Sequence, residues 1–584
     1  MYTSDLREHF HRSIREMETF VPGDWDDLSN VLLQAGNHEF GDSAPSSEDH
    51  PPSPGNVAFI TFEYGIDGVS IEISKYARAL EDNYGRDDAF SIHLIGEAFY
   101  PAASSLFAER WHRFIIKGIN GWNKWDGGKW FRALYRQKMP PSSRESARLA
   151  KEMYKQTISI TNRLGTYLIA HNVALLIPVN IASNPGNFSF TLSVALVSEI
   201  LGMGVLNINH DFYWEEGRTL SERGEDEAPG IRDHFFMNSE NRSFFALFQS
   251  LYPYNGKRWL QANINKLQSR KLTDQFHFHR EKVFEISTFV GNSFFEKYDQ
   301  SSINLARLRM GRILSDGEDV LRPLPISDHL DDIDQWMRDQ SPRVIGAGPG
   351  LSLDLRSDDL IILLQPTRII QRKRIGRNLE LIGALIHRSA LGRVFNQHAS
   401  RKLLLHITGP VPKEHKADLN QILQSYDGML RSLPPEIAER LFLSFSVGHQ
   451  EHPSFAKNKL DPLTVDEIFR MADAVVFPSE SEGRGLPIIE AGAVGIPIIC
   501  SRYRPEKVFA EVVGEHLPQE QQIHYTLFPE GEFSQQFLDE VAELLLHPQT
   551  NRSKIAQNKK AVQARYSRDS MRKDMANLLD KLID

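Results

Sequence analysis

The sequence predicts an α/β protein with two Rossmann-like, doubly wound domains and an N-terminal helical extension. Its 584 residues exceed what one hydrophobic core normally holds. In both halves, short apolar runs alternate with segments whose apolar residues recur about every 3.6 positions, which is typical of parallel strands joined by helices. No repeat of fixed period indicates a solenoid.

Composition and charge narrow the functional classes. The formal net charge of -9 argues against a general nucleic-acid-binding protein, which is normally basic. The single cysteine, Cys500, cannot form an intramolecular disulfide, so a cytoplasmic location is expected. The charged N-terminal segment lacks the apolar core of a secretory signal, and no apolar run approaches the roughly 20 residues that span a bilayer.

The N-terminal half is expected to form a first domain over residues 56–292. Residues 1–40 have the pattern of one or two amphipathic helices, and a linker rich in Pro, Ser and Gly follows, so residues 1–55 are interpreted as an extension. The expected strands are "NVAFITFEYG", "FSIHLIGEAF", "HNVALLIPVN" and "VLNINHDFYW". The expected helices are "DGVSIEISKYARALEDNYG", a helix around 144–170, and "NFSFTLSVALVSEILGMG".

The C-terminal half repeats the scheme over residues 356–565, after an expected connection over residues 293–355. Its expected strands are "DDLIILLQPTR", "RKLLLHITGPV", "LFLSFSV", "DAVVFPS" and "IPIICS". Its expected helices are "NLELIGALIHRSALG", "TVDEIFRMA" and one that runs from near Leu486 to Val494. Because ligands of open α/β sheets bind at the carboxyl ends of the strands, the segments that follow these strands are the candidate sites.

The stretch "SESEGRGLPIIEAGAVGIPIICS" carries two glutamates, Glu482 and Glu490, on either side of a turn with Gly483 and Gly485. A carboxylate near a buried strand is costly unless something binds it, which favours a ligand rich in hydroxyl groups. The free N–H groups of Gly485 and Leu486 at a helix N-terminus suit a phosphate. The alternative interpretation is a strand-turn-helix whose glutamates are capping and surface residues.

A basic turn, "QPTRIIQRKRIGRN", follows another expected strand. Arg368 and Lys373 are spaced so that both cations can reach one diphosphate, and three further arginines add positive potential. Departure of a nucleoside diphosphate builds negative charge on its bridging oxygen, which fixed cations stabilise. The alternative is a solvated basic turn.

Together, "PSESEGRGLPIIEAGAVGIPII" and "PTRIIQRK" resemble the donor-binding domain of the retaining glycosyltransferases of family 4, which have the GT-B fold of two domains facing a central cleft. The resemblance covers about residues 56–584 and is strongest over 360–500. It implies that Glu490 binds the donor ribose and Glu482 the hexose hydroxyls. The remaining donor contacts that it implies are the backbone amides of Gly485 and Leu486, Arg368 with Lys373 at the diphosphate, and Gly409 of "HITGPVP" near the base or phosphates.

In the N-terminal half, "YGIDGVSIEI" resembles the family's glycine loop, with Gly65, Asp67 and Gly68 facing the diphosphate and the acceptor, although any tight turn between strand and helix has this pattern. In "NINHDFYWEEGR", His210 and Asp211 match the family position whose histidine contacts the donor sugar; the alternative is a structural loop histidine. "HDFYWE" is also similar to the subset that includes mannosylglucosylglycerate synthases.

The sequence departs from the family pattern at three places in these motifs. The family's Pro-Asn-x-x-Asp element corresponds to "FVGNSFFEKYD", which has Asn292 but no proline. Arg374 stands where a glycine usually follows the lysine, and Arg484 stands where the glycine turn usually has phenylalanine.

Residues 110–138 form an insertion with four tryptophans, eight cations and a single aspartate. It suits a peripheral contact with an anionic membrane, stacking on a sugar, or binding of an anionic acceptor. The alternative is a lid or a packing insertion.

The resemblance, together with these motifs, implies a retaining, metal-independent hexosyltransferase that needs no cofactor and uses a nucleotide-sugar donor of the GDP-mannose or UDP-glucose type. The acceptor is expected to be a small organic or sugar hydroxyl, and the C-terminal helix, about 566–584, is expected from the resemblance to pack on the first domain. The rivals are a phosphorylase or a sugar-nucleotide epimerase of the same fold, and a non-catalytic scaffold. Phosphate-dependent turnover would favour the phosphorylase, and epimerisation without an acceptor would favour the epimerase. Failure to bind any nucleotide sugar would favour the scaffold.

Overall fold

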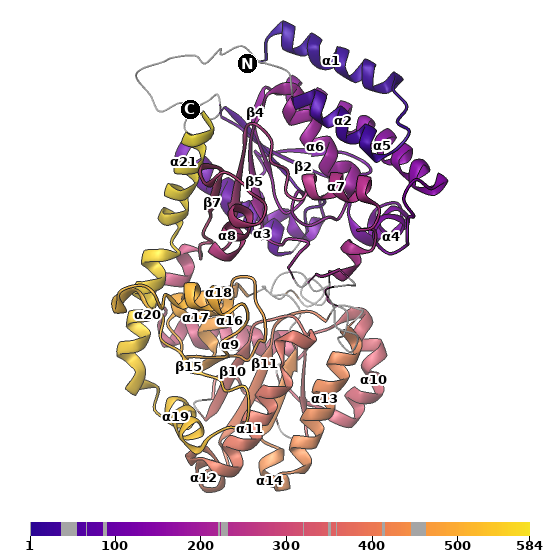
Figure 1. Ribbon diagram of the computed structural model, residues 1–584. Coiled ribbons are helices and arrows are strands. Elements are labelled where there is room, and N and C mark those ends of the chain that lie inside the picture. Colours follow the sequence, from indigo (N-terminus) through magenta and orange to yellow (C-terminus); the bar gives the residue numbers. More distant parts are fainter. Residues whose placement is uncertain are drawn as a thin grey trace. The chain divides into compact units, whose positions relative to one another are not determined.

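The computed structural model describes residues 2–36, 55–65, 67–85, 90–215, 217–219, 222, 230, 232–318, 320–348, 352–357, 359–411, 415–445, 459 and 463–583. The chain divides into two compact units (Figure 1). Unit 1 comprises residues 1–288 and 569–584, and unit 2 comprises residues 289–568. Of the expected linker after the N-terminal helices, all but Gly55 lies outside the described residues.

Unit 1 contains a seven-stranded sheet in the order β3-β2-β1-β4-β5-β6-β7, and every neighbouring pair is parallel. The four predicted strands are confirmed as β1 (Asn56–Ile60), β2 (Ile92–Gly96), β4 (Val173–Pro178) and β5 (Gly204–Asn209). Three strands of this sheet were not predicted: β3 (His112–Ile115), β6 (Trp259–Asn263) and β7 (Val283–Glu285). The strand order reverses at β1, so the carboxyl ends of β1 and β4 form the switch point of this sheet.

The helices of unit 1 cover this sheet, and the N-terminal extension is part of their packing. Phe10 of α1 and Trp25 of α2 are fully buried, and the indole N–H of Trp25 donates to Ser146 Oγ at 3.1 Å. Figure 1 shows α1 and α2 beside α5. The helices are α1 (Ser4–Thr19), α2 (Trp25–Gly36), α3 (Gly68–Tyr84), α4 (Lys129–Tyr135), α5 (Arg144–Ala170), α6 (Phe188–Leu201), α7 (Arg242–Leu251) and α8 (Lys266–Asp274).

The C-terminal helix α21 (Arg568–Ile583) also belongs to unit 1. Asn83 Nδ2 donates to the carbonyl of Arg572 at 2.9 Å, and Ser287 Oγ donates to Asp574 Oδ2 at 2.7 Å. These bonds attach the end of the chain to α3 and to the segment after β7.

Unit 2 contains an eight-stranded sheet in the order β15-β14-β13-β10-β11-β12-β9-β8. The five predicted strands are confirmed as β10 (Leu360–Gln365), β11 (Lys402–Ile407), β12 (Leu441–Phe445), β13 (Ala474–Phe477) and β14 (Ile498–Cys500). The expected connection, residues 293–355, is part of this unit: β8 (Leu324–Pro325) and β9 (Arg343–Gly346) extend the sheet, and β9 pairs antiparallel with β12. The last strand is β15 (Thr526–Leu527).

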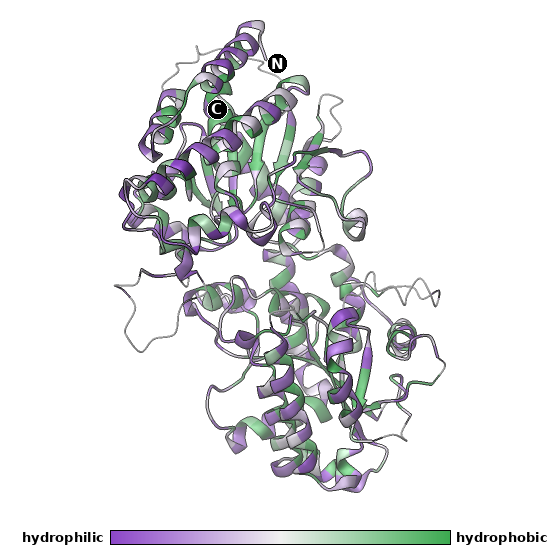
Figure 2. Cartoon of the chain, turned by 90° about the vertical axis from the view of Figure 1, so that its right-hand side faces the viewer, coloured by the Kyte–Doolittle hydropathy of each residue, from purple (hydrophilic) through white to green (hydrophobic). Residues whose placement is uncertain are grey.

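Helices pack on both faces of this sheet, which explains the continuous apolar runs in its strands. In β10, Ile361 and Leu363 belong to one hydrophobic cluster, whereas Ile362 and Leu364 belong to the other. Figure 2 shows the hydrophobic strands beneath helices with hydrophilic outer faces. The helices are α9 (Gln300–Leu314), α10 (Ile326–Asp339), α11 (Gly376–Arg388), α12 (Ala390–Gln397), α13 (Lys416–Arg431), α14 (Pro435–Ala438), α16 (Val465–Met471), α17 (Leu486–Val494), α18 (Glu506–Val513), α19 (Gln535–Leu546) and α20 (Arg552–Arg565). Within the described ranges, none of the helices is both apolar and long enough to traverse a bilayer.

Candidate functional site

The two motifs predicted for the donor meet at one edge of the unit 2 sheet. Strands β10 and β13 are hydrogen-bonded neighbours, so the loops that leave their carboxyl ends lie side by side. The N–H of Glu480 donates to the carbonyl of Arg372 at 2.8 Å, and the Arg372 guanidinium donates to the carbonyl of Ser481. The basic turn and the glutamate turn therefore form one structure, although more than a hundred residues separate them.

Lys373 and Glu482 form an ion pair at the centre of this structure. The ammonium donates to Glu482 Oε1, and the two side chains are 9% and 10% exposed. Arg372 Nη1 lies 3.8 Å from Glu482 Oε2. Burial lowers the pKa of Lys373, and the carboxylate of Glu482 opposes this shift. The predicted diphosphate ligand and the predicted hexose ligand are thus in direct contact.

Two further arginines of the basic turn are engaged by other carboxylates. Arg374 Nη2 lies 3.3 Å from Glu480, and its other amino group pairs with Glu530. Arg377 pairs with Glu380. The positive potential expected from these arginines is therefore partly neutralised by local partners.

Arg374 adopts a left-handed conformation, with φ at 47° and ψ at 39°. Glycine adopts this conformation at lower cost than arginine. The conformation at this position therefore suits glycine, the residue that usually follows the lysine in the resembled family.

Arg368 is exposed just beyond β10, and its backbone is held against Gly409. A Cβ atom on Gly409 would lie 2.2 Å from the carbonyl carbon of Thr367 and 2.3 Å from the nitrogen of Arg368. The N–H of Ile369 donates to the carbonyl of Pro410 at 3.1 Å. Glycine is required at position 409 because the turns after β10 and β11 touch there, and both turns carry predicted donor ligands.

The glycine turn of unit 2 ends at the helix α17, as predicted. Gly485 is the N-cap residue with φ at 70°, and a Cβ atom there would lie 2.3 Å from the hydroxyl of Tyr503. Leu486 is the first helical residue, and the first turn of a helix presents N–H groups that lack intrahelical acceptors. Gly483 is exposed, and Glu490 is half-buried in α17, one turn beyond Leu486.

In unit 1, His210 and Asp211 follow β5 at the carboxyl edge of the sheet. The backbone N–H of Asp211 donates to Asn180 Oδ1 at 2.9 Å, and Asn180 Nδ2 donates to Asp211 Oδ2 at 3.1 Å. Arg232 lies 3.2 Å from the other carboxylate oxygen. Gln268 Nε2 donates to the backbone carbonyl of His210 at 3.1 Å. The His210-Asp211 pair is therefore held by Asn180, Arg232 and Gln268, which come from three other segments and are called its frame below.

Glu215 bonds to this frame, and sequence reasoning missed it. Its carboxylate accepts from the N–H of Phe212 at 2.7 Å and from Gln268 Nε2 at 3.0 Å. Burial, followed by the nearby charge of Asp211, raises the pKa of Glu215 to about 7. Its only sequence signal was its place in "HDFYWEEG", after the aromatic cluster that follows the His-Asp pair.

A buried ladder of amide side chains supports the same edge and was also missed. Asn207 and Asn209 of β5 both donate to Gln261 Oε1 of β6, at 2.8 and 3.1 Å, and Asn209 also donates to Asn263 Oδ1 at 3.0 Å. The sequence signal was the polar residue at alternate positions in "VLNIN" and "LQAN". This ladder ties β5 to β6 immediately before His210.

The glycine loop of unit 1 forms the turn into α3. Asp67 is the N-cap residue, and its carboxylate accepts from Ser70 N–H at 2.9 Å and from Ser70 Oγ at 3.1 Å. Burial raises the pKa of Asp67. Gly65 N–H donates to Ser70 Oγ at 3.1 Å, and a Cβ atom on Gly68 would have no neighbour within 4 Å. The capping role of Asp67 is visible, and the contacts of Gly65, Asp67 and Gly68 with a diphosphate or acceptor stay predictions.

The tryptophan-rich insertion is mostly a packing element. Trp111, Trp125 and Trp130 are 3%, 1% and 6% exposed, whereas Trp122 is 37% exposed. Three of the four rings are therefore largely covered by the protein, which does not suit insertion into a membrane.

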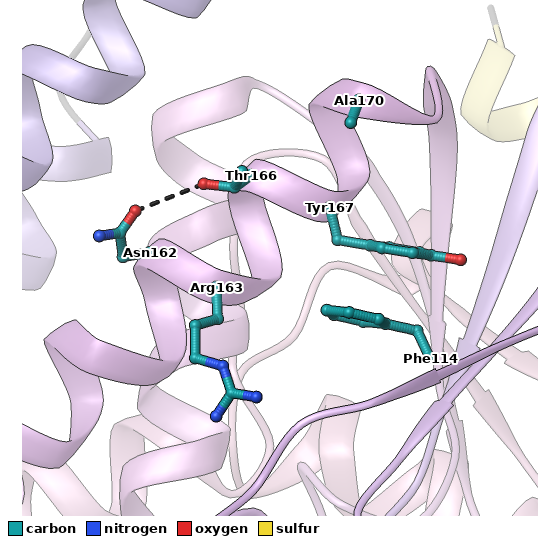
Figure 3. Close-up of a pocket in the computed structure, with 6 residues that line it drawn as sticks. All are labelled: Phe114, Asn162, Arg163, Thr166, Tyr167 and Ala170. Carbon is teal, nitrogen blue, oxygen red and sulfur yellow. Dashed lines mark hydrogen bonds between the residues drawn. The ribbon is translucent and has the colours of Figure 1, made fainter.

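A cavity of about 490 Å³ lies between α5 and β3, a strand of this insertion, and none of the predicted site residues lines it (Figure 3). Phe114 and Tyr167 form one wall, with their rings stacked 3.9 Å apart. Asn162, Arg163 and Thr166 from α5 form another, and Thr166 Oγ1 donates to Asn162 Oδ1 at 3.4 Å.

Comparisons with known proteins agree with the fold. Residues 448–562, which include Glu482 and Glu490, match the family described as Glycosyl transferases group 1. No curated protein matches. The structure is similar to a glycosyltransferase from Rickettsia africae ESF-5, with a TM-score of 0.51, 10% identity, and coverage of 91% of this chain and 98% of the other. It is also similar to Alr3699/HepE from Anabaena in complex with UDP and glucose, with a TM-score of 0.47, 11% identity, and coverage of 90% and 98%.

The predicted fold class, with two Rossmann-like sheets of the GT-B type and a helical N-terminal region, is confirmed. The family match over residues 448–562 supports a transferase enzyme that acts in glycosyl transfer.

Proposed function

We propose that the chain is a retaining, metal-independent glycosyltransferase of family 4 type. It moves a hexose from a nucleotide-diphosphate sugar, GDP-mannose or UDP-glucose in type, to a hydroxyl of a small soluble or glycan acceptor. The observation that carries this proposal is the contact between Lys373 and Glu482 beside the N-terminus of α17. It brings a cation suited to a diphosphate and a carboxylate suited to sugar hydroxyls to one edge of the unit 2 sheet.

The chemistry follows from these groups. When the bond between the anomeric carbon and the diphosphate oxygen breaks, negative charge develops on that oxygen, and Arg368 and Lys373 stabilise it. The acceptor oxygen forms the new bond on the same face of the sugar, and the departing diphosphate takes its proton. The departing diphosphate is thus the base that accepts the proton, and the proposed reaction has no step that uses a cofactor or a metal.

The two glutamates divide the recognition of the donor. Glu482 accepts hydrogen bonds from the hexose hydroxyls, and Glu490 accepts them from the ribose. The backbone N–H groups of Gly485 and Leu486 receive phosphate oxygens at the start of α17. In unit 1, His210 and Asp211 are proposed to contact the donor sugar. With one buried cysteine, Cys500, a reducing cytoplasm is the proposed location.

A donor screen tests this proposal. UDP and GDP are added to the full chain, and the midpoint of thermal unfolding, Tm, is measured, because a ligand that binds the native state alone raises stability by RT ln(1 + [L]/Kd). The nucleotide that raises Tm is then supplied as its hexose conjugates with an acceptor panel, with and without EDTA. We expect turnover that survives EDTA and a product with the anomeric configuration of the donor. Strict dependence on divalent metal, or an inverted product, would overturn the mechanism.

A further inference from the structure

A second cavity in unit 1, of about 610 Å³, lies between α5 and the segment that contains the tryptophan-rich insertion. Its charged lining includes Lys117 and Lys124 from the insertion, Lys155 from α5, and Glu97 from the end of β2. No residue of the predicted donor site lines it. It is therefore a separate candidate binding site within one unit.

The wall that carries Lys117 is held in place from two sides. Glu97 Oε2 accepts from three successive backbone N–H groups, those of Gly118, Ile119 and Asn120, at 2.6, 2.8 and 3.2 Å. From the other side, Asn187 Nδ2 donates to the carbonyls of Gly118 and Asn120 at 3.0 and 2.8 Å. The loop is thus preorganised, and the charge of Glu97 is directed at its amides.

The other acidic residues of the lining also have cations nearby. Asp126 lies 3.9 Å from Lys129, and Glu152 interacts electrostatically with Arg148 on the same helix. Among the lysines, Lys124 pairs with Glu63.

Two lysines of the lining are left for a ligand. In the part of the chain that the structure describes, neither Lys117 nor Lys155 makes an ion pair, and both are exposed. Two lysines on facing walls are therefore available to a group with negative charge.

The same cavity has groups that suit hydroxyls. Asn120, Gln156 and Ser159 line it, and the indole N–H of Trp125 donates to Gln156 Oε1 at 3.2 Å, which holds the amide plane in place. An inorganic anion alone would leave these groups unused. A carbohydrate that carries a phosphate or a carboxylate uses both the lysines and the amides.

The cavity also lies at the functional edge of the unit 1 sheet. Glu97 directly follows β2, and His210 directly follows β5, so both stand at carboxyl ends of parallel strands. Three strand spacings separate β2 from β5, which is roughly 14 Å at about 4.8 Å per spacing. A molecule that spans this distance is longer than one sugar ring.

From this geometry we propose that the cavity binds the anionic end of a carbohydrate acceptor, with Lys117 and Lys155 at its phosphate or carboxylate. The assignment of the ligand as an acceptor rests on the proposed glycosyl transfer. It is a specificity site, because its lysines act on a part of the acceptor that does not react.

The test is a calorimetric titration of the full chain with glucose 6-phosphate, glucuronate, glucose and inorganic phosphate. The variant is Lys117→Gln/Lys155→Gln, and the matched control is Lys151→Gln, an exposed lysine of α5 outside the cavity lining. We expect one of the charged sugars to bind the wild-type protein and the control at least tenfold more tightly than the double variant. Glucose should bind more weakly than that sugar, and which charged sugar binds identifies the anion as phosphate or carboxylate.

Nucleotide binding separates this proposal from the proposed function. The double variant should keep the wild-type Tm increase with UDP or GDP, which shows that it is folded. Equal binding of charged sugars to the wild type and the double variant would overturn the proposal, as would no binding at millimolar concentration while the nucleotide still binds. Binding of inorganic phosphate as tight as that of the charged sugars would overturn the carbohydrate assignment. Sedimentation with phosphatidylglycerol vesicles, lost in the double variant, would instead assign these lysines to a membrane.

Discussion

The ammonium of Lys373 contacts the carboxylate of Glu482, and neither side chain exposes more than 10% of its surface. Removing one partner from a buried ion pair leaves the other charge without compensation. In the proposed mechanism the same two groups also bind the diphosphate and the hexose. Stability and catalysis are therefore coupled at this pair, and variants must be designed to separate them.

Lys373→Met removes the charge while keeping most of the apolar stem. We expect the free energy of unfolding to fall on the order of 3 kcal/mol, because Glu482 loses its main partner. Glycosyl transfer should slow by about 10²-fold or more, because one contact to the developing charge is lost. Thermal unfolding and initial rates at saturating donor measure the two effects.

A double variant and a surface control distinguish the roles of Lys373. Lys373→Met/Glu482→Gln removes both charges, so it should regain part of the lost stability but none of the lost rate. Arg356→Met, which breaks an exposed pair with Asp354 in the same unit, should leave both Tm and rate unchanged. If Lys373→Met turned over at the wild-type rate, the lysine would have no place at the diphosphate.

The sequence allowed most of the fold to be predicted because apolar runs mark strands that are buried on both faces. β10, "LIILLQ", and β4, "VALLIP", are such runs. β6 was missed because "WLQAN" contains Gln261 and Asn263, polar residues that are buried here. Their amides bond to β5 and also to Tyr254 and Ser269. β3 was missed because this edge strand is largely exposed.

The candidate site was predicted in its residues but not in its contacts. The resemblance assigned Lys373 to the diphosphate and Glu482 to the hexose, two different parts of the donor. Their direct contact depends on β10 lying next to β13, a property of strand order rather than of either motif. Glu215 and Asn180 were missed for a similar reason. Glu215 bonds to Gln268 and Asn180 bonds to Asp211, and in each case the partner lies in a distant segment of the chain.

Gly485→Ala should damage the glycine turn of unit 2. Alanine at φ of 70° costs roughly 1–2 kcal/mol in backbone energy, and its Cβ would lie 2.3 Å from the Tyr503 hydroxyl. We expect a lower Tm and weaker binding of UDP or GDP. Adding Tyr503→Phe removes the nearest atom and should recover part of the Tm.

Gly68→Ala is the matched glycine variant in unit 1. Its Cβ would have no neighbour within 4 Å, and alanine suits a helical residue, so Tm should not fall. Normal nucleotide binding and Tm in Gly485→Ala would show that the turn tolerates a side chain and would contradict the geometry.

The carboxylates of unit 2 should differ in their kinetic effects. Glu490 is proposed to hold the ribose, which does not react, so Glu490→Gln should mostly raise the donor KM. Glu482 is proposed to hold the hexose, whose ring gains positive charge as the bond to phosphate breaks, so Glu482→Gln should mostly lower kcat. Steady-state kinetics over a range of donor concentrations measure both parameters.

Free nucleoside diphosphate is the control for the glutamates, because it has a ribose and no hexose. It should bind the Glu482 variant about as well as the wild type and the Glu490 variant more weakly. If both variants bound it normally, the two glutamates would be structural, and the interpretation as capping and surface residues would be correct.

Glu215 should give unit 1 a pH-dependent stability. Its pKa is raised from 4.5 to about 7 in the folded chain, so folding favours the protonated carboxyl. The stabilisation is fully present below about pH 4.5 and is lost as the pH rises through 7. At about 1.36 kcal/mol per pKa unit, the loss amounts to roughly 3 kcal/mol at most. Glu215→Gln stays neutral, so its unfolding free energy, measured in urea at pH 5, 6.5 and 8, should fall less than that of the wild type.

Comparing how steeply the unfolding free energy of each variant falls with pH separates the effect of Glu215 from that of other titrating groups. Glu222→Gln is the control, since bonds from Thr219 lower the pKa of Glu222 and keep it charged throughout this range. That variant should therefore follow the wild-type slope between pH 5 and 8. If Glu215→Gln also followed it, the carboxyl of Glu215 would not bind a proton on folding. Its bonds to Phe212 and Gln268 would then be made by a carboxylate at every pH tested.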